Sequence, residues 1–75
     1  MNKYDYRVTE RLNPEFGITT YGIAVWQRHG SQWTRLDSIE DISINKASIV
    51  QLAERCQRLQ LDAVHLKDVV LDHIS

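Results

Sequence analysis

Hydrophobic and polar residues alternate along the first half of the chain. From Tyr4 to Leu12 the apolar side chains fall on one face and the polar side chains on the other, which is typical of a half-buried strand. The segment NPEFG follows, where Pro14 suits the second position of a turn and Gly17 can take a positive φ. The run ITTYGIAVWQR is rich in β-branched and aromatic residues and predicts a second strand. Within this run, Gly22 indicates a bulge or a close approach of two backbones.

A hairpin at RHGS leads into a third strand, expected from Gln32 to Asp37. If His29 and Gly30 form a two-residue turn, the register pairs Trp26 with Trp33. Such a pair of facing rings is a strong cross-strand contact, and a slip of one residue would separate the rings. The same register places Val25 opposite Thr34 and Ile23 opposite Leu36.

Two sets of side chains compete for the core face of this sheet. The first set is Tyr21, Ile23, Val25 and Leu36, and the second is Ile18, Ala24, Trp26 and Trp33. We favour the first set as core, because its aliphatic residues suit a dry interior, whereas the second set has Arg35 beside its two tryptophans.

The second half of the chain has helical periodicity. The segment SIEDISINKAS is expected to be a crossover anchored by Ile39, Ile42 and Ile44, and Asn45 suits the N-cap of a helix. The predicted buried stripe of this helix is Ile49, Leu52, Ala53, Cys56 and Leu59. Asp62 can cap a second helix, and its predicted packing face is Ala63, Leu66, Val70 and Ile74. The pattern therefore predicts an α+β fold for residues 1–75 as one small domain, with a three-stranded antiparallel meander followed by two helices (βββαα).

Composition narrows the classes of function. Hydrophobic residues make up 43% of the 75 residues, charged residues 25%, and the formal net charge is -1, which argues against a general electrostatic grip on nucleic acid or anionic membranes. Cys56 is the only cysteine and lies in the apolar stripe of the first helix, so we expect a buried, inert thiol. The first residues lack the apolar segment of a signal peptide, and no run approaches the length of a membrane span. We expect a cytoplasmic protein.

The segment HLKDVVLDH is a candidate metal or catalytic site. His65, Asp68 and Asp72 are spaced to share one face of a helix, and a histidine with two carboxylates could bind a divalent cation. No cysteine pair or HExxH pattern completes such a site, and the alternative is the solvated side of an ordinary helix. We therefore expect no catalytic residues, no cofactor and no bound metal, and a protein that is not an enzyme.

Another candidate function is nucleic-acid binding by a sheet face that contains Arg7, Arg11 and Arg35. Aromatic residues on such a face could stack on bases. Asp5 shares the face with Arg7 and Arg11, however, and the negative net charge makes nucleic acid an unfavoured partner.

The leading hypothesis is a small interaction or regulatory module. Val64 and Leu71 lie away from the predicted packing face of the last helix, and Trp26 and Trp33 lie on the second sheet face. Apolar groups exposed together on a small domain mark contacts with another protein or with a second copy, so a homodimer is a reasonable expectation. Nothing in the sequence identifies a small-molecule substrate or a membrane contact.

Two segments carry a resemblance to a known family. YGIAV at 21–25 and HLKDVVLD at 65–72 resemble a family of small uncharacterised proteins from Firmicutes, and the similarity extends from about Tyr4 to Ile74. The resemblance implies a stand-alone bacterial cytoplasmic protein with a domain of unknown function. It supplies no catalytic residues.

Overall fold

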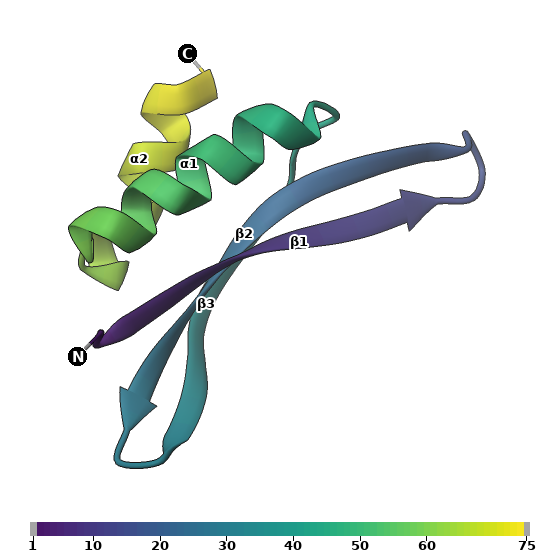
Figure 1. Cartoon of the computed structure of the whole chain (residues 1–75). Helices are drawn as coiled ribbons and strands as arrows, with labels where there is room; N and C mark the ends of the chain where they lie inside the picture. The colour runs from purple at the N-terminus through teal and green to yellow at the C-terminus, as the bar shows by residue number, and fades with distance from the viewer. Residues whose placement is uncertain (1, 75) are drawn as a thin grey trace.

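The computed structural model describes residues 2–74 and consists of a sheet covered on one face by helices (Figure 1). The elements are β1 (Tyr4–Asn13), β2 (Ile18–His29), β3 (Gln32–Ser43), α1 (Lys46–Leu59), the 3-10 turn η1 (Ala63–His65) and α2 (Leu66–Ile74). The strands form one antiparallel sheet in the order β1-β2-β3. The predicted α+β fold of order βββαα is confirmed. No helix within residues 2–74 is long and apolar enough to cross a membrane.

The first hairpin follows the alternation of the sequence. Tyr6 pairs with Val25 and Val8 with Ile23, so the side chains that these strands contribute to the core cluster share the face that meets the helices. Gly17 has a φ of 65° and its amide donates to the Asn13 carbonyl at 2.9 Å, as a tight turn requires. Tyr21, Ile23 and Val25 lie on the core face, as the sequence predicts.

The second hairpin has a different register from the predicted one. Trp26 pairs with Arg35 and Trp33 with Arg28, so the facing tryptophan pair is wrong. His29 pairs with Gln32, which makes Gly30 and Ser31 the turn residues. Gly30 has a φ of 63°, and a turn with positive φ at its first central position needs glycine there, whereas the predicted turn would have placed His29 at that position. The slip is two residues, so both tryptophans stay on one face.

β3 is longer and less regular than predicted. It continues past Asp37 to Ser43, through most of the segment expected to be a crossover. Its pairing with β2 is offset between Val25 and Trp26 and again between Tyr21 and Ile23. The offsets place Ile39 opposite Ile23 and leave Leu36 exposed, so the prediction of Leu36 as a core residue is wrong.

Gly22 lies where these offsets bring two strands unusually close. A Cβ atom at this position would lie 2.2 Å from the Ile39 carbonyl oxygen and 2.9 Å from Thr9 Oγ1. The expected bulge or close approach is therefore confirmed. Across from Gly22 the β3 backbone bends, and Asp41 has a φ of 56°.

α1 supplies most of the helical side of the core. Asn45 accepts from the Ser48 amide at 3.2 Å and forms the predicted N-cap. The buried residues are Ile49, Leu52, Ala53 and Cys56. Leu59 is exposed, against prediction, because it lies about 80° around the helix from Ile49. Ile44 is exposed as well, because it lies in the short connection after β3 instead of anchoring a crossover.

The second helical segment begins with η1 and packs beside α1. Asp62 caps it by accepting from the Val64 amide at 3.2 Å. Leu66 and Val70 are buried as predicted, whereas Ile74, also predicted to pack, is 56% exposed at the end of α2. A hydrogen bond of 2.6 Å between Ser48 Oγ and His73 Nε2 joins the first turn of α1 to the last turn of α2.

Two glutamine side chains, Gln57 in the last turn of α1 and the C-cap residue Gln60, cover part of the free edge of β1. Gln57 Oε1 accepts from the Tyr6 amide at 2.7 Å, and Gln60 Oε1 accepts from the Tyr4 amide at 2.9 Å. The side-chain amides of Gln57 and Gln60 donate to the Tyr4 carbonyl at 3.3 and 3.0 Å. These bonds satisfy backbone groups that an edge strand would otherwise offer to another chain.

Candidate functional site

A shallow apolar groove of about 290 Å³ separates α2 from the second half of β3. Its lining residues are Ile39, Glu40, Asp41, Ile42, Lys67, Val70, Leu71 and Ile74. Apolar side chains from both elements form most of the groove, and the charged residues stand among them. We call this surface the α2–β3 groove.

The groove exists because α2, which forms one of its sides, is a short helix. α2 has nine residues, and Val70 anchors it in the core. Leu71 and Ile74 point away from that contact and remain 49% and 56% exposed. On the other side, the offsets in β3 bring Ile39 and Ile42 to the edge of the core, where both are half-buried.

The charged residues of the groove differ in how they are paired. Asp41 accepts from the Thr20 hydroxyl and from Arg11 Nη1, the latter at 3.1 Å. Glu40 lies 3.7 Å from the same guanidinium, a long and exposed contact that contributes little. Lys67 forms no ion pair with any residue from 2 to 74. One free cation and one weakly paired carboxylate therefore border the groove.

The four residues predicted to form a partner surface lie in three places. Leu71 lines the groove. Val64, in η1, is 75% exposed but is not part of the groove lining. Trp26 is half-buried and Trp33 is exposed, and both lie on the sheet face opposite the helices. The structure therefore leaves apolar surface at these positions but does not join the positions into one patch.

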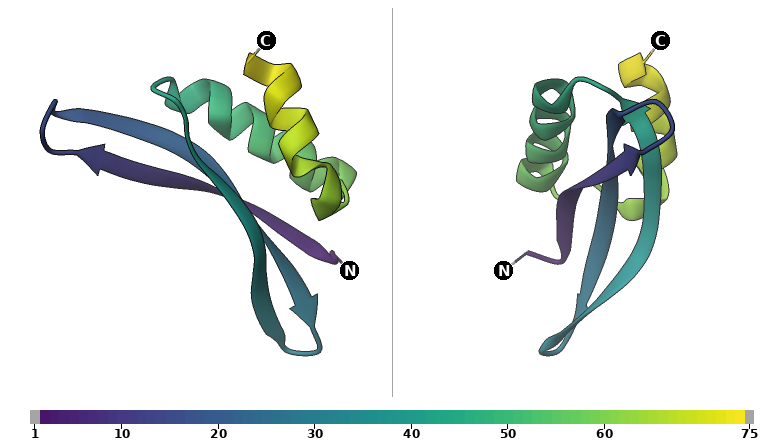
Figure 2. Two further views of the ribbon diagram at one scale, coloured as in Figure 1. Left: turned by 180° about the vertical axis from the view of Figure 1, so that it is seen from behind. Right: turned by 90° about the vertical axis from the view of Figure 1, so that its right-hand side faces the viewer.

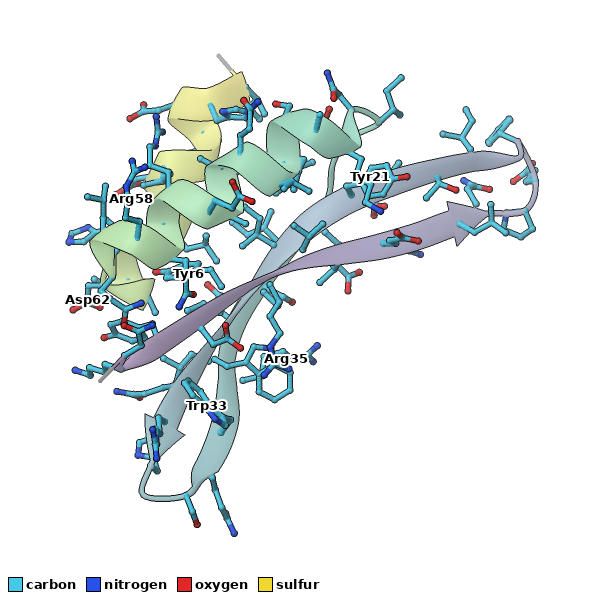
Figure 3. All side chains as sticks on the ribbon, viewed as in Figure 1. Tyr6, Tyr21, Trp33, Arg35, Arg58 and Asp62 are labelled. Carbon is cyan, nitrogen blue, oxygen red and sulfur yellow. The ribbon has the colours of Figure 1, made fainter. Side chains whose placement is uncertain are left out.

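The outer sheet face combines aromatic and charged side chains. Arg7 stacks over the Trp26 ring with 4.9 Å between its Cζ atom and the ring centroid, and its Nε donates to Asp5 at 2.6 Å. Arg35 is the cross-strand partner of Trp26. Figure 3 shows Arg35 on the side of the sheet away from the helices and Tyr6 pointing toward them.

The arginines of the nucleic-acid hypothesis share this region but two of them are paired. Arg7 contacts Asp5, and Arg11 contacts Asp41 and Glu40. A carboxylate beside a guanidinium cancels much of the attraction for a phosphate. The face therefore carries mixed charge, with Arg35 as the predicted arginine that has no acidic partner among the described residues.

The candidate metal residues do not form a site. His65 closes η1, and Asp68 and Asp72 lie in α2. Within residues 2–74, no group of three or more histidine, cysteine, aspartate or glutamate side chains could hold a metal ion. Every buried side-chain nitrogen and oxygen in the same range has a hydrogen-bond partner, so none points to a hidden ligand site.

Burial favours the neutral forms of the Cys56 thiol and the Tyr6 hydroxyl. Cys56 is a buried free thiol, and burial raises its pKa. Burial also raises the pKa of Tyr6, and the neighbouring Cys56 adds to the shift; the Tyr6 hydroxyl donates to the Leu61 carbonyl. Neither group has the exposure and lowered pKa of a nucleophile.

Sequence reasoning missed most of the groove. The sequence pattern places Ile74 on the packing face and Ile42 in a crossover, and it assigns no role to Glu40 or Lys67. The usable signal was local: Ile74 follows Leu71 by three residues, so a helix that leaves Leu71 exposed also exposes a side chain at that spacing. No local signal could bring Ile39 and Ile42 beside α2.

Comparison with known proteins identifies a family but no activity. The sequence profile of a family described as "Family of unknown function (DUF6514)" matches residues 1–75, so the chain belongs to that family. No curated protein and no solved structure matches the chain.

Proposed function

We propose that this member of the family of unknown function DUF6514 is a non-enzymatic protein-interaction module that binds through the α2–β3 groove. The observation that carries the proposal is the pair Leu71 and Ile74, about half exposed beside Ile39 and Ile42 in a concave apolar surface. Covering such side chains contributes about 25 cal/mol for each Å² of apolar surface removed from water. A small domain gains that energy from the groove only by association.

The shape of the groove favours a protein as the partner over a small molecule. Pockets for small ligands span about 300–1,000 Å³ and surround most of the ligand, with a few polar groups converging on it. At about 290 Å³ this groove is at the lower end of that range, and it is shallow and bordered by charges of both signs. An apolar centre with a polar border is the usual arrangement of a protein–protein interface.

The charges of the chain make nucleic acid a less favoured partner than protein. Arg7 and Arg11 already contact carboxylates, and the net charge of the chain is -1. The apolar surface of the groove offers nothing to a phosphate backbone. We further propose that the module works in the cytoplasm of a bacterium, with its single cysteine reduced; the origin in Firmicutes stays a prediction.

Photo-crosslinking from the groove tests the proposal. A photoreactive phenylalanine analogue replaces Leu71 in a tagged protein, and a matched variant has the analogue at Phe16, which is 68% exposed in the turn between β1 and β2, outside the groove lining. We expect irradiation of cells to give discrete protein adducts from position 71 and not from position 16. Absence of adducts from position 71, or the same adducts from both positions, would refute a binding role for the groove.

A further inference from the structure

We infer that the occupant of the α2–β3 groove is a second copy of this chain, packed groove against groove about a two-fold axis. The inference rests on the proposed function and names its partner. It is drawn from the placement of unlike charges at the groove, from the self-facing apolar side chains and from the state of the two sheet edges.

The charges of the groove complement themselves under two-fold rotation. α2 and β3 rise in the same direction on the two sides of the groove (Figure 2). Lys67 is the first α2 residue of the groove lining and Glu40 is the second of the four β3 residues that line it, so the two charges lie on opposite sides of the groove at the same end. A two-fold axis parallel to the groove exchanges its α2 and β3 sides and brings Lys67 of one subunit to Glu40 of the partner subunit, twice in each dimer.

The pairing state of the two charges suits this arrangement. Lys67 has no acidic partner among residues 2–74, and Glu40 has only the 3.7 Å contact with Arg11. Both charges can therefore enter a new pair without breaking a strong one. Asp41 is already held by Thr20 and Arg11, so we assign it no role across the interface.

The apolar part of the groove is equally suited to a copy of itself. In an isologous contact the same patch meets itself, so Leu71 and Ile74 would cover the partner subunit's groove while their own is covered. A stable dimer of ordinary size needs about 800 Å² from each partner, or about 15% of the 5207 Å² that this chain exposes. Leu71 and Ile74, 49% and 56% exposed, would form the apolar centre of such a contact.

Extension of the sheet is a less suitable route to a dimer. The Gln57 and Gln60 side chains occupy the start of the β1 edge. At the groove, the positive φ of Asp41 and the pairing offsets disturb the β3 edge. Interrupted edges resist strand addition, so side-chain packing is the contact left to this surface.

Charge reversal combined with light scattering tests the inference. The solution mass is measured over a concentration series for the wild type, Lys67→Glu, Glu40→Lys and the double variant. We expect a dimer for the wild type, a dissociation constant at least about tenfold higher for either single reversal, and recovery of the dimer in the double variant. Glu40→Gln removes the charge without placing a cation beside Arg11, and Glu15→Lys makes the same reversal in the β1–β2 turn and should leave the dimer unchanged.

The outcomes separate this inference from the proposed function. A wild-type monomer at every concentration overturns the second copy, and the groove still binds protein if position 71 crosslinks to other chains. A dimer that ignores both reversals, or that the double variant fails to restore, also overturns it. A monomer without any crosslinks removes the dimer and the proposed function together. Circular dichroism of each variant confirms that these exposed substitutions leave the fold intact.

Discussion

The glutamine bonds at the β1 edge allow a quantitative prediction. In the change Gln57→Ala, the Tyr6 amide loses its acceptor at 2.7 Å and the Tyr4 carbonyl loses a donor at 3.3 Å. The Tyr4 carbonyl keeps the Gln60 amide at 3.0 Å, so the Tyr6 amide is the group left without a partner. The substitution removes no core side chain, because Gln57 is outside the buried cluster.

The expected cost follows from these two bonds. A typical intramolecular hydrogen bond contributes about 0.5–1.5 kcal/mol net, and the longer of the two contributes at the low end. We therefore expect Gln57→Ala to lower the free energy of unfolding by about 1–2 kcal/mol. For a domain of this length, that loss lowers the midpoint of thermal unfolding by roughly 6–13 °C.

Urea unfolding and amide hydrogen exchange measure the two parts of this prediction. The matched control is Gln51→Ala, the same change at an exposed position of α1 that makes no hydrogen bond with the described residues outside the helix backbone. We expect Gln51→Ala to be neutral or slightly stabilising, since alanine is the better helix former. Equal stability of the two variants, with unchanged protection of the Tyr6 amide, would show that the glutamine bonds are not formed in solution.

Three further predictions concern the fold and the unfavoured partner. We expect Gly22→Ala to lower the free energy of unfolding by at least about 2 kcal/mol, because the added Cβ would meet the Ile39 carbonyl. Gly17 has open space around it but a positive φ, so Gly17→Ala should lower the same free energy by about 1 kcal/mol. The reverse order in urea unfolding would contradict the close approach at Gly22. Burial raises the pKa of Tyr6 above the ordinary 10.0, so above about pH 10 the unfolded chain releases a proton that the folded chain keeps, and the free energy of unfolding should fall as pH rises. Tyr6→Phe should make that fall shallower. Parallel plots of stability against pH for the wild type and Tyr6→Phe would refute this prediction. Fluorescence anisotropy with a labelled single-stranded oligonucleotide should detect no binding stronger than about 100 µM at low salt, and salt-dependent binding abolished by Arg35→Ala would revive the nucleic-acid hypothesis.

The sequence predicted those parts of the fold that depend on local periodicity. Alternation identified the core face around Ile23 and Val25, and helical spacing identified Ile49, Leu52 and Cys56. The errors at Leu36 and in the tryptophan pairing share one cause, because the register of β3 depends on a glycine turn and on offsets that no period of two reveals.

The candidate site was predictable only in part, for a similar reason. The exposure of Leu71 follows from its angle on a helix whose other side contains Val70. The groove also needs Ile39 and Ile42, which reach α2 only because β3 continues to Ser43 and shifts its pairing on the way. One half of the site is thus a property of a helix, and the other half is a property of tertiary pairing.

The lengths of the elements explain why surplus apolar surface collects beside α2. A strand of 12 residues extends about 40 Å, whereas α1 with 14 residues covers about 21 Å and α2 with nine covers about 14 Å. The helices therefore cover only the middle of the sheet, and the radius of gyration is 12.7 Å against about 11 Å for a compact chain of this length. The shorter helix lies over β3, and its few turns cannot cover the apolar residues that the longer strand presents there. Lengthening α2 within one chain would close this gap, and a second chain placed against the groove, as we propose, would do the same without added residues.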